Sequence, residues 1–437
     1  MRIFVVLLKT QIMKMRFKFL SITLISSLLL SETTTAQVNL NGSEANSEIN
    51  TITTAVPFLL ISPDSRSGAM GDVGVALSPD ANSIHWNPAK LAFIDDDKDM
   101  GFSLSYSPWL RALVNDINLA YLSGYKKLDE SSAIGFSLRY FSLGDITFTN
   151  NYGDEIRNFK PNEFAIDGTY SRKLGERFGA GIAARYIYSN LTGGISSSGA
   201  DVKAGQSVAV DISAYYETEE FKISDKDAYV AYGLNISNIG AKMSYTDAAN
   251  RDFIPTNMRL GTAFNVELDD FNKLTIALDA NKLLVPTQPV YLQENGSVIY
   301  GTDGPIIFSG KDPNVGVASG IFGSFSDAPG DVVIDEDGNT TEVVKGTKFK
   351  EELREVNLSV GAEYLYNDLL AIRAGYFHEH WSKGNRRFIS LGAGIKYSVF
   401  ELDLSYLLAL TQASPLANTL RFTLRFNFGE AMEEASL

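Results

Sequence analysis

The chain has 437 residues, of which 45% are apolar, and a formal net charge of −14. Nucleic acid is excluded as a partner, because phosphate contacts need a basic surface. The chain contains no cysteine, which excludes disulfides and cysteine-based metal or redox sites.

Residues 1–36 have the features of a secretory signal peptide. Basic residues precede a short apolar core, Phe19–Leu30, and small residues precede a cut ahead of Gln37. The core is too short to span a bilayer as a helix. We therefore expect export through the inner membrane, which leaves a mature chain with a charge of about −18.

No later run of about 18 apolar residues is present, so a membrane location would require a closed β-barrel. Apolar and polar residues alternate instead, as between Leu420 and Phe428, which is typical of strands with one apolar face. This pattern predicts an all-β chain with fourteen antiparallel transmembrane strands. They are expected near residues 100–110, 115–125, 132–140, 162–173, 177–189, 207–217, 227–236, 257–268, 272–281, 355–366, 369–378, 387–397, 400–408 and 418–428.

The expected connections alternate between tight turns and long loops, and the longest loop covers about residues 282–353. Outer-membrane barrels of diderm bacteria have short periplasmic turns and long extracellular loops. The connection near Leu110 to Val114 is an exception, since it is short although it belongs to the long-loop side. We predict an outer-membrane barrel over residues 99–428, followed by a tail at 429–437.

Two groups of side chains on the expected strands carry further predictions. Aromatic residues near strand ends predict interfacial girdles, and they are Tyr106, Trp109, Tyr121, Tyr125, Tyr140, Tyr188, Tyr366, Tyr376 and Trp381. Seven residues of each charge fall on the inward faces, which predicts ion pairs inside the barrel. They are Arg139, Arg185, Arg259, Arg373, Lys396, Arg421 and Arg425, with Asp167, Asp211, Glu267, Asp279, Glu363, Glu401 and Asp403.

Residues 37–98 fit no strand and are rich in turn formers and small residues. This segment could fold inside the barrel mouth as a hatch, or it could be a periplasmic tail that leads into the first strand. Within it, WNPAKLA (Trp86–Ala92) resembles the hatch motif of FadL-like outer-membrane transporters. The motif residues that we single out are Asn82, Ser83, Trp86, Asn87, Pro88 and Ala89.

A longer stretch, from Ser62 to Phe93 and then from Tyr106 to Tyr125, resembles the PorV (LptO) family of the type IX secretion system. The second part of this match includes Pro108, Trp109, Asn115 and Asp116. The resemblance implies a FadL-like barrel of fourteen strands. It also implies binding to a SprA/Sov-like translocon and to cargo with C-terminal signal domains, and transfer to an attachment complex containing PorU-, PorQ- and PorZ-like proteins. The contact residues are unknown and are expected in the extracellular loops.

Two further motifs predict no site. His378 and His380 flank Glu379 at a strand end and could chelate a metal, but a polar strand end is the favoured interpretation. Asp335–Asn339 has calcium-loop residues at the wrong spacing, which favours a solvated turn. We expect no enzyme, cofactor or metal, since no nucleophile and base stand out. The alternatives are a FadL-like channel for hydrophobic molecules and a lipid A-modifying enzyme.

Overall fold

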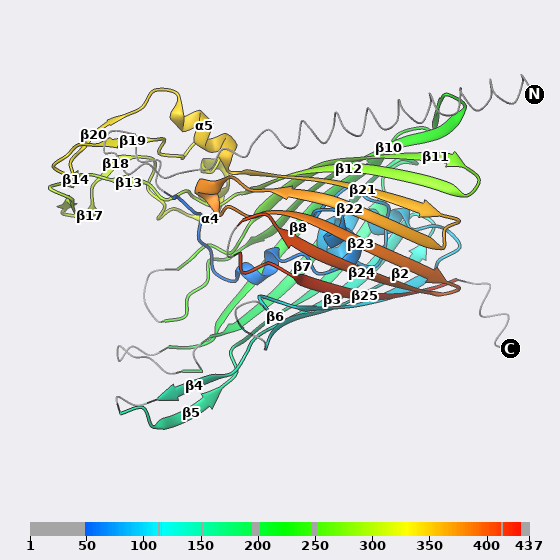
Figure 1. Cartoon of the computed structure of the whole chain (residues 1–437), viewed down its shortest axis with the longest axis horizontal. Coiled ribbons are helices and arrows are strands. Elements are labelled where there is room, and N and C mark those ends of the chain that lie inside the picture. The colour runs from blue at the N-terminus through cyan, green and yellow to red at the C-terminus, as the bar shows by residue number, and fades with distance from the viewer. Residues whose placement is uncertain are drawn as a thin grey trace, which may run out of the picture. The chain divides into compact units, whose positions relative to one another are not determined.

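The computed structural model describes residues 49–429 except 112–113, 115, 150–151, 192, 195–201, 247–250 and 412–413. The expected signal peptide, Asn115 and all but the first residue of the expected tail lie outside the described residues. Within them, fourteen long strands form one closed antiparallel barrel (Figure 1). These strands are β1 (Met100–Pro108), β2 (Ile117–Asp129), β3 (Ser132–Leu143), β6 (Asn162–Lys173), β7 (Phe178–Asn190), β8 (Gly205–Glu217), β10 (Lys226–Gly240), β11 (Asn257–Asp269), β12 (Asn272–Leu283), β21 (Val356–Tyr366), β22 (Leu370–His378), β23 (Arg387–Tyr397), β24 (Phe400–Ala409) and β25 (Thr419–Phe428).

Each strand pairs with its neighbours in the chain, and the sheet closes where β1 pairs with β25. The register at this closure places Leu104 opposite Leu424 and Ser105 opposite Thr423. Closure gives every strand a partner on both sides, which a sheet in lipid requires because lipid cannot satisfy backbone polar groups. All fourteen strands predicted from the alternation are confirmed, with ends that differ by at most four residues.

The two faces of the barrel differ in chemistry, as β1 illustrates. Ser103, Ser105 and Ser107 are buried inside, whereas Phe102 and Leu104 are 48% and 54% exposed on the outer face. An apolar exterior suits lipid, and the small inner residues leave room for chain inside the barrel. Period-two alternation therefore identified the strands because each face has a single environment.

The prediction of aromatic girdles is wrong at Tyr121 and Tyr125, which are 1% and 4% exposed and face the interior. The guanidinium of Arg139 lies 5.4 Å from the Tyr121 ring centroid. Tyr125 packs in an apolar cluster with Ile84 and Leu91 of the N-terminal segment. The interior accepts these rings because that segment supplies apolar surface there. Tyr106, Tyr140, Tyr366 and Trp381 are exposed, in accordance with the prediction.

The two ends of the barrel also differ. Short turns close one end, for example between β2 and β3 and between β11 and β12, and longer connections lie at the other (Figure 1). The longest connection, between β12 and β21, contains α4 (Val317–Gly323), α5 (Thr347–Arg354) and several two-stranded ladders. The minor strands are β4 (Ile146–Thr149), β5 (Glu155–Phe159), β9 (Phe221–Ile223), β13 (Val290–Tyr291), β14 (Gln293–Glu294), β15 (Ser297–Val298), β16 (Tyr300–Gly301), β17 (Gly304–Pro305), β18 (Ile307–Ser309), β19 (Val332–Ile334) and β20 (Thr340–Val343). None of the helices in the described part of the chain has the length and hydropathy needed to cross a bilayer.

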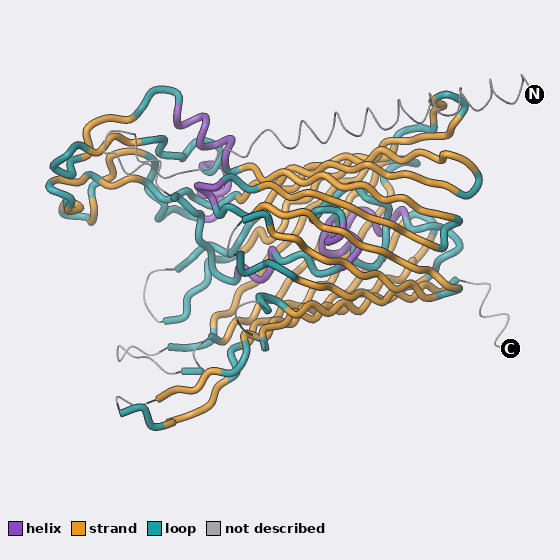
Figure 2. The backbone as a smooth tube through the Cα atoms, in the orientation of Figure 1, coloured by secondary structure: helices purple, strands orange, loops and turns teal. Residues whose placement is uncertain are grey.

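Residues 49–98 are the described part of the expected segment 37–98; most of them lie inside the barrel, and we name them the hatch segment. Its helices are η1 (Pro57–Leu60), α2 (Ser65–Ala69), α3 (Ser83–Trp86) and η2 (Pro88–Phe93). Figure 2 shows helical turns surrounded by strands, and almost every residue from Ser62 to Ala92 is buried. Of the two interpretations of this segment, the structure supports the hatch rather than a tail outside the barrel.

Candidate functional site

The hatch segment crosses the barrel from one end to the other. At the long-loop end, the backbone amide of Asn50 donates to the carbonyl of Ser382 (2.9 Å), in η3 (Trp381–Lys383) between β22 and β23. At the short-turn end, the amide of Asp99 donates to the carbonyl of Phe428 (2.9 Å). The segment therefore occupies the full depth of the lumen before the chain enters β1.

The predicted hatch motif lies at the centre of this segment. The indole Nε1 of Trp86 donates to Asp64 Oδ1 (2.6 Å), and the Arg259 guanidinium lies 4.6 Å from the Trp86 ring centroid. A Cβ at Gly74 would overlap the Trp86 ring. Trp86 thus joins two parts of the hatch segment to one another and to β11 of the barrel.

The remaining motif residues bind the backbone. Asn87 Nδ2 donates to the carbonyls of Val75 and Ala214 (2.9 Å each), and its Oδ1 caps η2 by accepting from the Ala89 amide (3.1 Å). Pro88 follows at the first position of η2, where a missing N–H is tolerated. In the preceding turn, Asn82 Oδ1 accepts from Ser123 Oγ (3.2 Å) and Ser83 Oγ accepts from the Asp80 amide (3.0 Å).

A closed ring of six charged side chains joins the hatch segment to the barrel wall. Arg66 pairs with Glu363 (2.8 Å), Glu363 with Arg373 (2.5 Å), and Arg373 with Asp403 (2.5 Å). Asp403 then pairs with Arg425 (2.6 Å). Asp80 closes the ring by accepting from Arg425 (3.1 Å) and Arg66 (3.4 Å).

This ring, which we name the ion ring, has three cations and three anions and is buried. Arg66 and Asp80 come from the hatch segment, whereas the other four members lie on β21, β22, β24 and β25. Removing one partner of a buried ion pair costs about 3–5 kcal/mol, because the other charge is left unpaired out of water. The ion ring therefore opposes displacement of the hatch segment.

Other inward charges that the sequence predicts have either charged or uncharged partners. Arg185 contacts Asp167 (2.5 Å) and Asp211 (3.0 Å). Arg139 donates to the Leu59 carbonyl (2.6 Å), and Asp279 Oδ2 accepts from the amides of Gly74 and Val75. The predicted interior ion pairs are confirmed for Arg185 with Asp167 and Asp211 and for the barrel members of the ion ring, but not for Arg139 and Asp279, which bond to backbone groups of the hatch segment. The alternation gave no sign of the hatch residues that take part.

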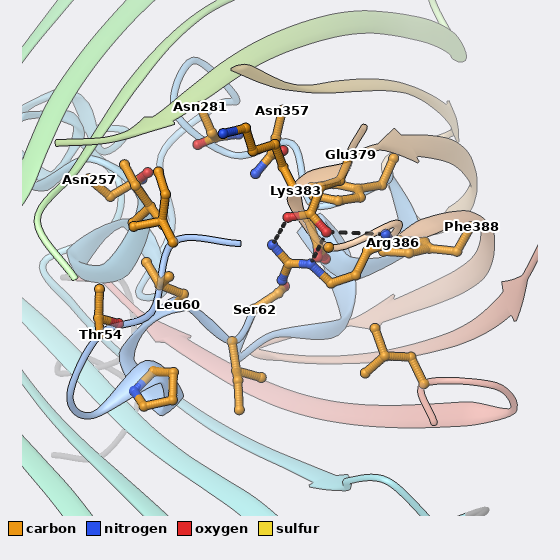
Figure 3. Close-up of a pocket in the computed structure, with 18 of the residues that line it drawn as sticks. Thr54, Leu60, Ser62, Asn257, Asn281, Asn357, Glu379, Lys383, Arg386 and Phe388 are labelled. Atoms are coloured by element: carbon orange, nitrogen blue, oxygen red, sulfur yellow. Dashed lines mark hydrogen bonds and ion pairs between the residues drawn. The ribbon is translucent and has the colours of Figure 1, made fainter. Parts of the chain in front are cut away.

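One cavity of about 450 Å³ opens at the long-loop end and is lined by the hatch segment, β11, β22 and β23. Figure 3 shows Glu379 joined to Arg386 beside Lys383, and Thr54, Leu60 and Ser62 on the hatch side. Glu379 accepts from Arg386 Nε (2.9 Å) and Nη2 (2.7 Å). A second cavity, of about 470 Å³, lies at the short-turn end and is lined by five of the six members of the ion ring. The hatch segment lies between these two cavities.

The family-like residues after β1 lie at the long-loop end. Pro108 is the last residue of β1, and the Arg421 guanidinium lies 5.9 Å from the Trp109 ring centroid. Asp116 Oδ2 accepts from the amide of Asp145 (2.8 Å), which joins two neighbouring loops. These residues shape the rim of the barrel.

The two motifs that predicted no site have local partners. His378 Nδ1 bonds to the hydroxyl of Tyr376 (3.2 Å), and His380 Nδ1 accepts from the Ser382 amide (3.3 Å). Burial, followed by the positive charge of Arg354, lowers the pKa of His380 to about 4. Asp335 Oδ1 accepts from the Asn339 amide (2.7 Å) in an exposed turn. The histidine motif is therefore a polar strand end, and Asp335–Asn339 is a solvated turn, as the favoured interpretations predicted.

The loop between β12 and β21 exposes large apolar side chains to water. Phe322 of α4 and Phe349 of α5 are 78% and 71% exposed, and Leu353 and Tyr300 are also exposed. These residues lie beyond the barrel, so lipid does not cover them. Exposed apolar patches are typical of surfaces that contact other proteins or a membrane.

A closed barrel of fourteen strands with an apolar outer face, short turns at one end and long loops at the other defines an outer-membrane β-barrel protein. Residues 44–290 match the family model "Type IX secretion system protein PorV". Because this match covers more than half of the 437 residues, the chain belongs to the PorV family of the type IX secretion system. The family predicted from Ser62 to Tyr125 is confirmed.

Solved structures similar to this chain include two toluene transporters and a FadL homologue. The toluene transporter TodX of Pseudomonas putida is 12% identical with a TM-score of 0.42, over 87% of this chain and 99% of that one. A FadL homologue of Pseudomonas aeruginosa is 11% identical with a TM-score of 0.38, over 87% of this chain and 99% of that one. The toluene transporter TbuX of Ralstonia pickettii is 10% identical with a TM-score of 0.42, over 84% of this chain and 98% of that one. A comparison with curated protein sequences found no match.

Proposed function

We propose that this chain handles protein cargo at the long-loop end of its barrel. In this proposal it binds a SprA/Sov-like translocon barrel and secreted proteins with C-terminal signal domains. It then passes the cargo to an attachment complex of PorU-, PorQ- and PorZ-like proteins. The chain reaches the outer membrane by means of the signal peptide at residues 1–36 and performs no catalytic step itself.

The observation that carries this proposal is the set of water-exposed aromatic residues on α4 and α5. Burying one phenylalanine contributes about 1.5–3 kcal/mol, so Phe322 and Phe349 together could contribute about 3–6 kcal/mol to a complex. A monomer gains nothing from leaving such groups in water. A protein partner at the cell surface would cover them.

The charged interior argues against the alternative, a channel for hydrophobic molecules, although the hatch segment itself is common to both. Such a molecule would have to pass the hatch segment and the buried ion ring, whose members are charged rather than apolar. A site for an apolar ligand is lined mainly by hydrophobic side chains. The polar interior therefore favours protein binding at the extracellular loops over transport of a hydrophobic molecule through the lumen.

Affinity purification of the tagged chain from detergent-solubilised membranes tests the proposal. We expect a very large barrel protein and proteins with related C-terminal domains to co-purify. The double variant Phe322→Ser/Phe349→Ser should recover at least about tenfold less of them, since 1.4 kcal/mol corresponds to a factor of ten.

Phe271→Ser is the matched control, because Phe271 is 56% exposed in a short turn at the opposite end. It should recover the partners as the parent does. Recovery of the chain alone with an apolar molecule in its lumen would favour the channel and refute the proposal. Equal loss of partners in the control and in the double variant would place the binding surface elsewhere.

A further inference from the structure

We propose that Asp327, Glu352 and Glu355 bind a calcium ion that ties the long loop to the rim of the barrel. Asp327 follows α4, Glu352 lies on α5, and Glu355 directly precedes β21. One carboxylate oxygen from each residue lies within 4.8 Å of the corresponding oxygens of the other two. Calcium binds oxygen at about 2.3–2.6 Å, so two of its ligands can lie up to about 5 Å apart.

Asp327 provides an observation that is independent of the clustering. Its side chain is almost fully buried, at 3% exposure, and its Oδ2 accepts from the Thr287 amide (3.1 Å). Its Oδ1 is also buried and has no hydrogen-bond partner among the described residues. A buried acceptor without a partner costs about 1–3 kcal/mol. A cation between the three carboxylates would give this oxygen its missing partner.

The charged groups in and around the cluster carry an excess of negative charge that a divalent cation would neutralise. Lys282 pairs with Glu352 (3.2 Å) and Glu355 (2.6 Å), and Lys383 pairs with Glu351 (2.7 Å) and Glu355 (3.0 Å). Four carboxylates thus face two ammonium groups, which leaves a net charge of −2. Two positive charges from one ion would neutralise this buried excess.

The donor set indicates which ion binds. All three residues offer oxygen, so a metal that prefers nitrogen or sulfur ligands is disfavoured. Magnesium requires oxygens at about 2.0–2.1 Å in near-ideal octahedral geometry and usually retains several waters. A largely buried cluster with separations up to 4.8 Å fits the larger and more flexible calcium shell better.

The ion would add a further link between parts of the chain that hydrogen bonds and ion pairs already join, such as the Ala328 amide with Glu352 (2.9 Å). Through Glu352 it would hold α5, through Asp327 the segment after α4, and through Glu355 the first residues of β21. Phe322 and Phe349 lie on these same two helices. The site would therefore fix how the loop presents its aromatic residues, although its existence does not depend on the proposed protein partners.

Isothermal titration of CaCl₂ into the purified, chelator-treated full chain in detergent tests the site. We expect one calcium per chain, with a dissociation constant of about 10⁻⁴–10⁻³ M as in other extracellular modules. Asp327→Asn should weaken binding at least tenfold. Asp335→Asn should bind as the parent does, because Asp335 lies in an exposed turn of the same loop. MgCl₂ at the same concentrations should not compete.

Trypsin provides a second readout. Calcium should slow cleavage at the loop lysines Lys311 and Lys345 in the parent but not in Asp327→Asn. If Asp327→Asn fails to fold, as judged by its heat-dependent migration in gels, Glu352→Gln replaces it. Absence of binding at 10 mM calcium, or loss of binding in Asp335→Asn alone, would contradict the site. Neither result depends on a translocon or cargo, so the proposed function would be unaffected.

Discussion

Replacing Glu363 with glutamine should loosen the hatch segment from the barrel wall. Glu363 is 1% exposed and accepts from both Arg66 (2.8 and 3.0 Å) and Arg373 (2.5 Å). The glutamine keeps the shape but gives the buried ion ring an uncompensated positive charge. Breaking a buried pair costs about 3–5 kcal/mol, and we take the lower end because both arginines retain a second carboxylate.

The absence of cysteine in the chain allows a direct assay. Ser67→Cys places a single thiol next to Arg66, at a position that is 4% exposed. A charged maleimide reacts with this thiol only when the hatch segment opens locally, so the labelling rate reports the population of open molecules. A loss of about 3 kcal/mol predicts labelling about 150-fold faster in Glu363→Gln than in the parent.

Glu267→Gln is the matched control. Glu267 faces Lys273 at 3.6 Å with 59% of its side chain exposed, and such surface pairs contribute at most about 1 kcal/mol. It should change the labelling rate by less than about fivefold. Labelling of Glu363→Gln within twofold of the parent, in a folded barrel, would refute the view that the ion ring holds the hatch segment.

Three further changes test other parts of the structure. Gly74→Ala should speed labelling of Ser67→Cys, because its Cβ would overlap the Trp86 ring; an unchanged rate would mean that the ring moves freely. Trp86→Phe removes the donor to the buried Asp64 and should cost about 1–3 kcal/mol, with labelling about 5- to 150-fold faster. Ile212→Arg on the outer face, at the middle of β8 and therefore near the expected bilayer midplane, should destabilise the barrel by about 2–4 kcal/mol in urea unfolding in bilayers, whereas Tyr397→Arg at the end of β23 should cost at most about 1 kcal/mol. Equal losses at both positions would contradict the assigned membrane depth.

The barrel could be predicted from the sequence because lipid and lumen impose a period of two on every strand. β21 is an example, with Leu358 and Val360 outside and Ser359 and Glu363 inside. The inward charges could be predicted for the same reason. The exceptions are Tyr121 and Tyr125, which face inward: Tyr125 packs on apolar groups of the hatch segment, and Tyr121 packs against the Arg139 guanidinium.

The contacts of the hatch segment could not be predicted, because its partners lie far away in the chain. Arg66 pairs with Glu363 across 297 positions, and no local pattern encodes such a pair. The same holds for the carboxylates of the long loop. Glu352 and Glu355 share one helix end, but the turn that brings Asp327 to them leaves no periodic signal.

Site-specific photocrosslinking in living cells tests the central claim, that the long-loop end binds protein, most directly. A photoreactive amino acid at Phe349 should form crosslinks to a very large barrel protein or to secreted proteins with C-terminal signal domains. The same amino acid at Phe271, at the short-turn end, should form none of these. Absence of protein crosslinks at Phe349 in cells that secrete normally, or the same crosslinks at Phe271, would contradict the claim.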